Sequence, residues 1–124
     1  MSVIVGVAIG GACGALARYG IDRFIEERSG SSFPWSTFAI NVSGCFVVGL
    51  VIAALVDRDA APDWLRAALV VGFCGGYTTF STFAQETLDL VETSASVLGL
   101  VSVAANVVLG VLAVLAGARI ARLA

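Results

Sequence analysis

The sequence has no lysine and no histidine, and charged residues make up only 13% of its 124 positions, where an ordinary soluble domain has about a quarter. Its three cysteines, Cys13, Cys45 and Cys74, lie far apart inside apolar runs. Without histidine, this spacing indicates neither a zinc site nor a disulfide framework, and we interpret the cysteines as small packing residues. The net charge of −2 offers no basic surface, so we expect no nucleic-acid partner.

Apolar residues account for 59% of the chain, and the charges gather in short clusters between long uncharged runs. A helix needs about 20 mostly apolar residues to cross the hydrocarbon core of a bilayer. Four stretches meet this requirement, at about residues 3–20, 36–56, 64–90 and 96–118. The segments between them hold most of the charge and both prolines, and they are too short to be domain linkers. The sequence therefore predicts an all-α integral membrane protein in which residues 1–124 form a single domain of four transmembrane helices.

The arginines give almost no orientational bias, although arginines in short loops normally fix membrane topology. One face would carry four of them and the other three: Arg58, Arg66, Arg119 and Arg122 against Arg18, Arg23 and Arg28. Two interpretations stay open on this pattern. The chain could take one orientation, set by its N-terminus or by the last two arginines, or it could insert both ways and form an antiparallel dimer.

The third span carries the most unusual segment, the glycine- and threonine-rich residues 72–83. Trp64 begins this span about nine residues earlier, a helical distance of roughly 14 Å, so the segment lies near the bilayer midplane. The pair Gly75-Gly76 favours non-helical dihedral angles, and Thr78 or Thr79 is suited to cap a helix that starts again. We therefore predict two half-helices that meet at a break near residues 74–79.

Such a break exposes backbone groups that lipid cannot satisfy, so it survives only in contact with protein, a cavity or ions. Carbonyl groups at the end of the first half-helix, at Gly75, suit a cation, and the N–H groups that open the second, near Thr79, suit an anion. Phe80 and Phe83 follow at helical spacing and could turn their positive ring edges to that anion. The alternative is a glycine kink that neighbouring helices satisfy.

Uncharged polar residues interrupt two other spans. Thr37 and Asn41 share a face of the second helix, and Ser102 and Asn106 share a face of the fourth. Either pair could line an ion path or could only join helices through hydrogen bonds. The first, second and fourth spans carry no Asp, Glu or Lys near their middles. This absence disfavours a proton-coupled transporter, which needs a titratable group on its path.

At these residues the chain resembles the Fluc (CrcB) family of fluoride channels. The resemblance covers nearly the whole chain in three blocks, of which the last is highly specific: residues 10–19, 37–44 and 72–83. Two departures stand out. Ser36-Thr37 replaces the usual Gly-Thr, and Gly110 lies where the family would have a hydrogen-bonding side chain, so the fourth helix matches less clearly.

The resemblance implies a passive fluoride-selective channel, not an enzyme, that lets a bacterial cell export fluoride across its membrane. It also implies an antiparallel, dual-topology homodimer. A sodium ion would lie at the dimer centre, bound by backbone carbonyls of Gly75 and Thr78, and Arg18 would attract anions to a vestibule. The fluoride pore would be lined by residues of three helices: Asn41, Phe80, Ser81, Thr82, Phe83, Glu86, Ser102 and Asn106. The alternatives are a small dual-topology proton-coupled multidrug exporter and a structural membrane protein that organises a complex.

Overall fold

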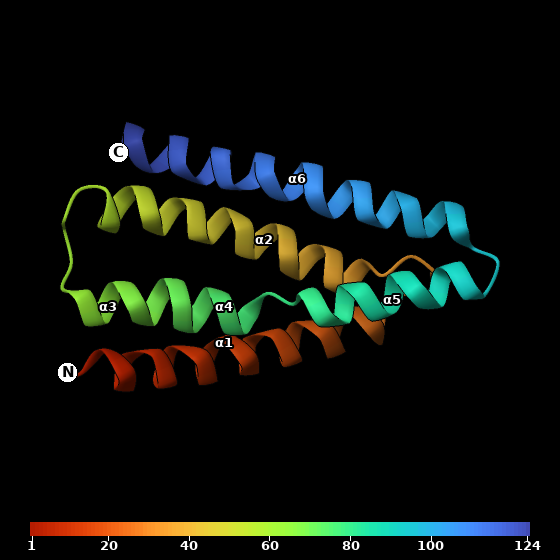
Figure 1. Ribbon diagram of the computed structural model, residues 1–124, viewed down its shortest axis with the longest axis horizontal. Coiled ribbons are helices and arrows are strands. Elements are labelled where there is room, and N and C mark those ends of the chain that lie inside the picture. The colour runs from red at the N-terminus through yellow and green to blue at the C-terminus, as the bar shows by residue number, and fades with distance from the viewer.

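The computed structural model describes residues 1–124, which form helices joined by short loops, without strands (Figure 1). In chain order the elements are α1 (Val3–Glu26), α2 (Trp35–Val51), η1 (Ile52–Val56), α3 (Asp63–Ala67), η2 (Ala68–Cys74), α4 (Gly75–Tyr77), α5 (Phe80–Glu92) and α6 (Ser96–Leu123). The two η segments are π-helical turns that continue the helices before them. The elements therefore combine into four long rods, with both chain ends at one end of the bundle.

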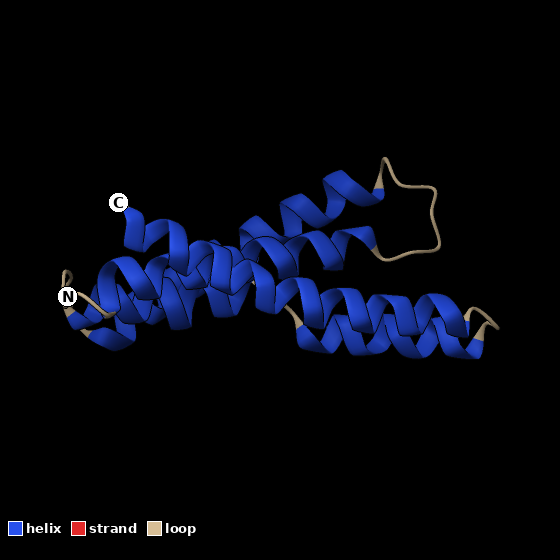
Figure 2. Cartoon of the chain, turned by 90° about the horizontal axis from the view of Figure 1, so that it is seen from above, coloured by secondary structure: helices blue, strands red, loops and turns tan.

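Each rod is long and apolar enough to cross a membrane: Val3–Glu26, Trp35–Val56, Asp63–Glu92 and Ser96–Leu123. This confirms the prediction of an all-helical protein with four membrane-spanning helices. Successive rods run in opposite directions, so α2 and α6 are parallel to each other (Figure 1). At the end that carries the α1–α2 loop, the bundle divides into an arm of α1 and α2 and an arm of α5 and α6 (Figure 2).

Because α2 and α6 pack in parallel, the same offset in residue number relates their contacting residues from one end of the contact to the other. Asn41 bonds Asn106 and Asp57 bonds Arg122, and the partners of both pairs are 65 residues apart. Between these bonds the backbones approach closely, because a Cβ atom added at Gly49 would lie 2.2 Å from the Val114 carbonyl oxygen. Such close contact between small residues is the main source of helix association in lipid.

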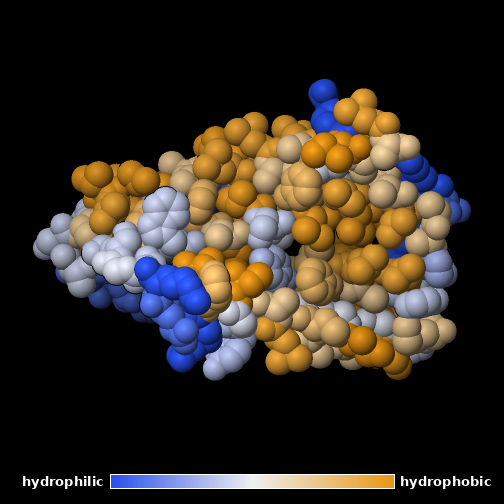
Figure 3. All heavy atoms as spheres, turned by 180° about the vertical axis from the view of Figure 1, so that it is seen from behind, coloured by the Kyte–Doolittle hydropathy of each residue, from blue (hydrophilic) through white to orange (hydrophobic).

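The first rod packs in the same way against the first half of the third. A Cβ atom at Gly10 would lie 2.0 Å from the Ala68 carbonyl oxygen, and one at Gly76 would lie 2.7 Å from that of Gly11. Gly6, Gly10 and Gly14, which repeat at four-residue spacing on α1, therefore pack against the third rod of the same chain. Few residues become buried in this arrangement, only 19 of 124. Hydrophobic residues consequently cover most of the surface, and hydrophilic ones gather near the ends (Figure 3).

Candidate functional site

The third rod is interrupted at Thr78 and Thr79, which are extended, with φ and ψ of −79° and 159° and of −146° and 118°. The helix before them continues through Gly75 and Gly76 to Tyr77. The break therefore lies within the predicted residues 74–79, but the expectation of non-helical backbone at the glycine pair is wrong. Gly76 instead permits close contact with α1, and the extended backbone falls on two β-branched threonines, for which it is a favoured conformation.

The N-cap of α5 is Thr79, one of the two threonines predicted for this role. Its Oγ1 accepts a hydrogen bond from the Thr82 N–H at 3.3 Å and donates to the Thr82 hydroxyl at 3.0 Å. The N–H of Thr78 still bonds the Cys74 carbonyl, at 3.0 Å. Side chains of this type at an N-cap satisfy one of the free N–H groups that open a helix. The second half-helix thus begins cleanly at Phe80.

The backbone of Thr79 itself is satisfied from another helix. Asn41 of α2 accepts its N–H on Oδ1 at 2.9 Å and donates from Nδ2 to its carbonyl at 3.2 Å. The same Nδ2 reaches Oδ1 of Asn106 at 3.2 Å, and Asn106 donates to the Ser102 carbonyl at 2.9 Å. Three of the four rods therefore meet in one uncharged hydrogen-bonded cluster. Asn41 thus makes the bonds expected of a residue that joins helices, and its place in an ion path stays a prediction.

Four predicted pore residues lie on the first turn of α5. The Phe80 and Phe83 rings have centroids 5.8 Å apart and planes inclined by 50°. Phe83 is half-buried, whereas Phe80 keeps 80% of its surface exposed and Ser81 and Thr82 are exposed as well. These side chains therefore face outward from the single chain. Any closed path along them requires a second surface that covers this side of α5.

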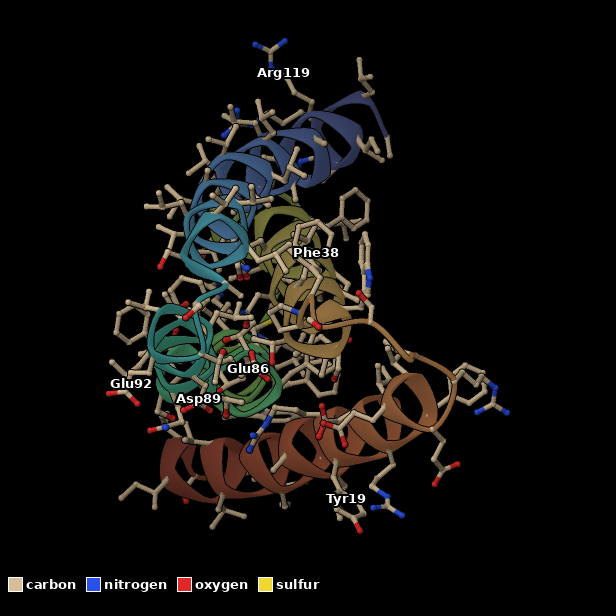
Figure 4. The ribbon with its side chains drawn as sticks, turned by 90° about the vertical axis from the view of Figure 1, so that its right-hand side faces the viewer. Tyr19, Phe38, Glu86, Asp89, Glu92 and Arg119 are labelled. Atoms are coloured by element: carbon tan, nitrogen blue, oxygen red, sulfur yellow. The ribbon has the colours of Figure 1, made fainter.

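Farther along α5, Glu86 enters the bundle and accepts a hydrogen bond from Thr37 Oγ1 at 2.8 Å. Its other oxygen, Oε2, is buried without a hydrogen-bond partner, and so is the hydroxyl of Ser102, whose residue is fully buried. Buried polar atoms are normally paired, so each is available to a further polar group. In Figure 4, Glu86 points toward the centre of the bundle and Glu92 points outward.

Glu86 also borders a hollow with a volume of 420 Å³, which lies between the α1–α2 loop and α5. Ser36 lines it and donates to Asp22 of α1. No pattern in the sequence predicts this bond directly. The departure from the usual Gly-Thr was its only signal, because a glycine could not make the contact.

Arg18 lies against the break and does not extend freely. Its Nε donates to the Gly76 carbonyl at 3.2 Å, and the residue is half-buried. The adjacent carbonyl of Gly75 differs, because its regular donor four residues on, the Thr79 N–H, is bonded to Asn41. Gly75 is exposed and has no heavy atom within 4 Å of an added Cβ position. The chain has no group of three His, Cys, Asp or Glu side chains that could hold a metal ion.

Four apolar rods and an uncharged, hydrogen-bonded break define a multi-pass membrane protein. Residues 5–118 match the family described as "CrcB-like protein, Camphor Resistance (CrcB)", and the chain belongs to this family. It is 47% identical over 116 residues to a protein of Solibacter usitatus named "Fluoride-specific ion channel FluC", covering 94% of this chain and 95% of that one.

Two further relatives have the same name. The protein of Acidobacterium capsulatum is 47% identical over 112 residues, covering 90% of this chain and 89% of the relative. That of Rhizobium johnstonii is 45% identical over 118 residues, covering 94% and 93%. The resemblance noted in the sequence is therefore confirmed at the level of the family, and the chain is a bacterial membrane protein. The roles of individual residues in a pore, at a vestibule or at a cation stay predictions.

Proposed function

We propose that this protein is a passive, fluoride-selective channel that lets cytoplasmic fluoride leave the cell and so relieves fluoride toxicity. The observation that carries the proposal is the uncharged break at Thr79, which Asn41 ties to the neighbouring helices. The names of relatives that match along nearly their whole length support it. A channel makes and breaks no covalent bond, so the protein is not an enzyme.

Fluoride is a small anion whose shell of water must be replaced by other hydrogen-bond donors along a narrow path. The remaining amide N–H of Asn106 and the hydroxyls of Ser81 and Thr82 would supply such donors, and Asn41, whose two amide N–H groups bond Thr79 and Asn106, would hold Asn106 in position. The first turn of α5 contains no acidic residue, so its N–H groups and the positive end of the helix dipole favour an anion. Edges of Phe80 and Phe83 add positive potential without binding the anion tightly.

Two other functions have weaker support. A proton-coupled multidrug exporter needs a titratable group on its path. Glu86, the acidic side chain that points toward the centre of the bundle, is bound by Thr37 (Figure 4), and the relatives are named as fluoride channels. A protein that only organises a complex would have no need of an interrupted helix at this depth, because an unbroken helix satisfies its own backbone groups.

Two copies in opposite orientations would form the working channel. Phe80 is 80% exposed directly beside the break, so a second chain is needed to enclose a path along it. Only 19 residues are buried in one chain, which leaves a broad apolar surface for a partner and for lipid. Four arginines against three give each orientation a similar preference in the membrane. An antiparallel, dual-topology homodimer agrees with all three observations.

A sodium ion at the dimer centre fits the chemistry of the break. Hard cations bind oxygen ligands. Gly75 is an exposed residue, and the usual helical donor to its carbonyl, the Thr79 N–H, is bonded to Asn41 instead. The carbonyl of Thr78 follows at the start of the extended segment. Gly75 and Thr78 of each chain would bind the ion. When bound, it would supply a positive charge shared by the carbonyl oxygens of two subunits.

Growth of a fluoride-sensitive bacterium that lacks its own fluoride exporter tests the proposal in cells. We expect the chain to restore growth on fluoride, while Asn41→Asp, inserted at the same level in the membrane, does not. Because both strains carry the protein in the membrane, a difference reports on function and not on expression. Wild-type protein that reaches the membrane and gives no protection would contradict a role in fluoride export.

A further inference from the structure

A second, shallower hollow lies outside the bundle, where α1 ends and α2 begins. It has a volume of 320 Å³ and is lined by Phe24, Ile25, Arg28, Ser29 and Trp35. We refer to it as the Arg28 pocket. Two walls are aromatic, Phe24 with 57% and Trp35 with 49% of their surfaces exposed. At the end of the molecule that carries the α1–α2 loop, hydrophilic residues lie directly beside hydrophobic ones (Figure 3).

This pocket lies at the level where a membrane changes from hydrocarbon to headgroups. The membrane-spanning helix α1 ends at Glu26 and the next begins at Trp35. Trp35 packs with Phe33 and Phe38, with ring centroids 4.6 and 5.9 Å away. Aromatic residues of this kind, and tryptophan above all, gather at the interface between membrane and water. The pocket is therefore open to the headgroup region of the lipids around the protein.

The charge of the pocket is positive and uncompensated. Three of the seven arginines form ion pairs with acidic side chains: Arg23, Arg66 and Arg122. Arg28 does not, and no Asp or Glu lines the pocket. Its guanidinium lies 3.7 Å from the centre of the Phe24 ring, and Nη1 donates to the Phe24 carbonyl at 2.9 Å. Most of the five N–H donors of the guanidinium remain available.

We propose that the Arg28 pocket binds the headgroup of an anionic phospholipid. The guanidinium, fixed on the Phe24 ring, would bind the phosphate, for which its planar donors are well matched. The Ser29 hydroxyl would add a neutral donor, and the rings of Phe24 and Trp35 would contact the first carbons of the acyl chains. An anionic lipid fits better than a zwitterionic one because Arg28 is the only charged residue that lines the pocket, and no carboxylate is there to pair with a headgroup amine.

Tryptophan fluorescence tests this proposal directly, because the chain has only two tryptophans. Trp64→Phe leaves Trp35, in the pocket wall, as the single reporter. The protein is reconstituted in phosphatidylcholine vesicles with equal fractions of either brominated phosphatidylglycerol or brominated phosphatidylcholine, whose bromine quenches nearby indoles. We expect a preference of about fivefold for quenching by the anionic lipid, the factor typical of one arginine at a charged membrane surface.

Two variants of the reporter protein complete the test. Arg28→Gln should reduce quenching by the anionic lipid to the level of phosphatidylcholine. Arg119→Gln, which removes another exposed arginine that points away from the bundle (Figure 4), should leave the preference unchanged. Equal quenching by both lipids, no quenching by either, or a preference that survives Arg28→Gln would overturn the proposal. No fluoride measurement enters the test, so its outcome is independent of the proposed channel function.

Discussion

Asn41 satisfies both backbone groups of Thr79, accepting its N–H at 2.9 Å and donating to its carbonyl at 3.2 Å. Inside an ordinary helix, residues of the neighbouring turns form these hydrogen bonds. At the break, the Asn41 side chain of the second helix forms them instead. Its Nδ2 also contacts Asn106 at 3.2 Å, so the same amide connects the break to the fourth helix. Neutral groups of three helices thus form one hydrogen-bonded cluster inside an apolar bundle.

Replacement of Asn41 should separate its two roles. Asn41→Ala leaves both groups of Thr79 without partners, a cost of about 1–3 kcal/mol per unsatisfied buried group, so the protein should unfold at lower temperature. Asn41→Asp retains an acceptor for the Thr79 N–H but loses the donor and adds negative charge. We expect its fluoride efflux from vesicles to fall by about tenfold or more, which corresponds to a loss of about 1.4 kcal/mol in the interaction of fluoride with the path. Wild-type efflux in both variants would contradict a role for this amide in the ion path.

Phe80→Ile and Phe83→Ile should each slow or stop fluoride efflux while the dimer stays intact. Isoleucine keeps the apolar volume roughly constant but lacks the positive ring edge. Efflux is measured with a fluoride electrode and assembly by cross-linking in the membrane. Tyr19→Ile, which removes an exposed aromatic ring of α1 that points away from the bundle (Figure 4), is the control and should conduct normally. If both α5 substitutions conduct like the control, the aromatic edges have no part in conduction.

Glycine substitutions should affect stability according to the space around each position. Gly49→Ala would place a methyl group 2.2 Å from the Val114 carbonyl oxygen, and overpacking of this kind costs about 1–3 kcal/mol. Gly20→Ala meets no atom within 4 Å and gains the better helix propensity of alanine. Thermal unfolding in detergent should give a lower midpoint for the first and an equal or higher one for the second. Equal midpoints would mean that α2 and α6 do not pack this closely.

Removal of sodium should weaken the proposed dimer. If Gly75 and Thr78 carbonyls of two chains bind this ion, replacement of sodium by a bulky organic cation leaves those oxygens facing one another without a shared positive charge. We expect the dimer to dissociate at lower temperature and fluoride efflux to slow, and sodium to reverse both effects. Dimer stability and efflux that do not depend on sodium would exclude a structural role for it.

Helix count and the interruption of the third span could be predicted because lipid imposes strong rules on a sequence. About 20 apolar residues are needed for each crossing, and Thr79 has a side chain suited to an N-cap. The position of the break could not be predicted from the glycines. Gly75 and Gly76 are compatible with either a break or a close helix contact, and the packing of α1 against Gly76 decides between them. That contact joins segments far apart in the chain.

The candidate site could be predicted only in part, because its contacts also join segments that are far apart in the chain. Asn41 and Asn106 stood out as polar residues in apolar helices, but the bond between them depends on the register of α2 and α6. The contact of Arg18 with the Gly76 carbonyl depends on the close packing of the first and third rods. The exposure of Phe80 is also a tertiary property, because the amphipathic pattern of one helix does not show which of its faces another chain covers.

Efflux from vesicles that contain only the purified protein tests the central claim most directly. The vesicles are loaded with potassium fluoride or potassium chloride, and a potassium ionophore keeps the movement of anions electrically silent. Ion-selective electrodes then follow each anion without a pH gradient. We predict rapid efflux of fluoride and chloride efflux at the rate of protein-free vesicles. Fluoride efflux no faster than in protein-free vesicles, or equal efflux of the two anions, would contradict the assignment of a fluoride-selective channel.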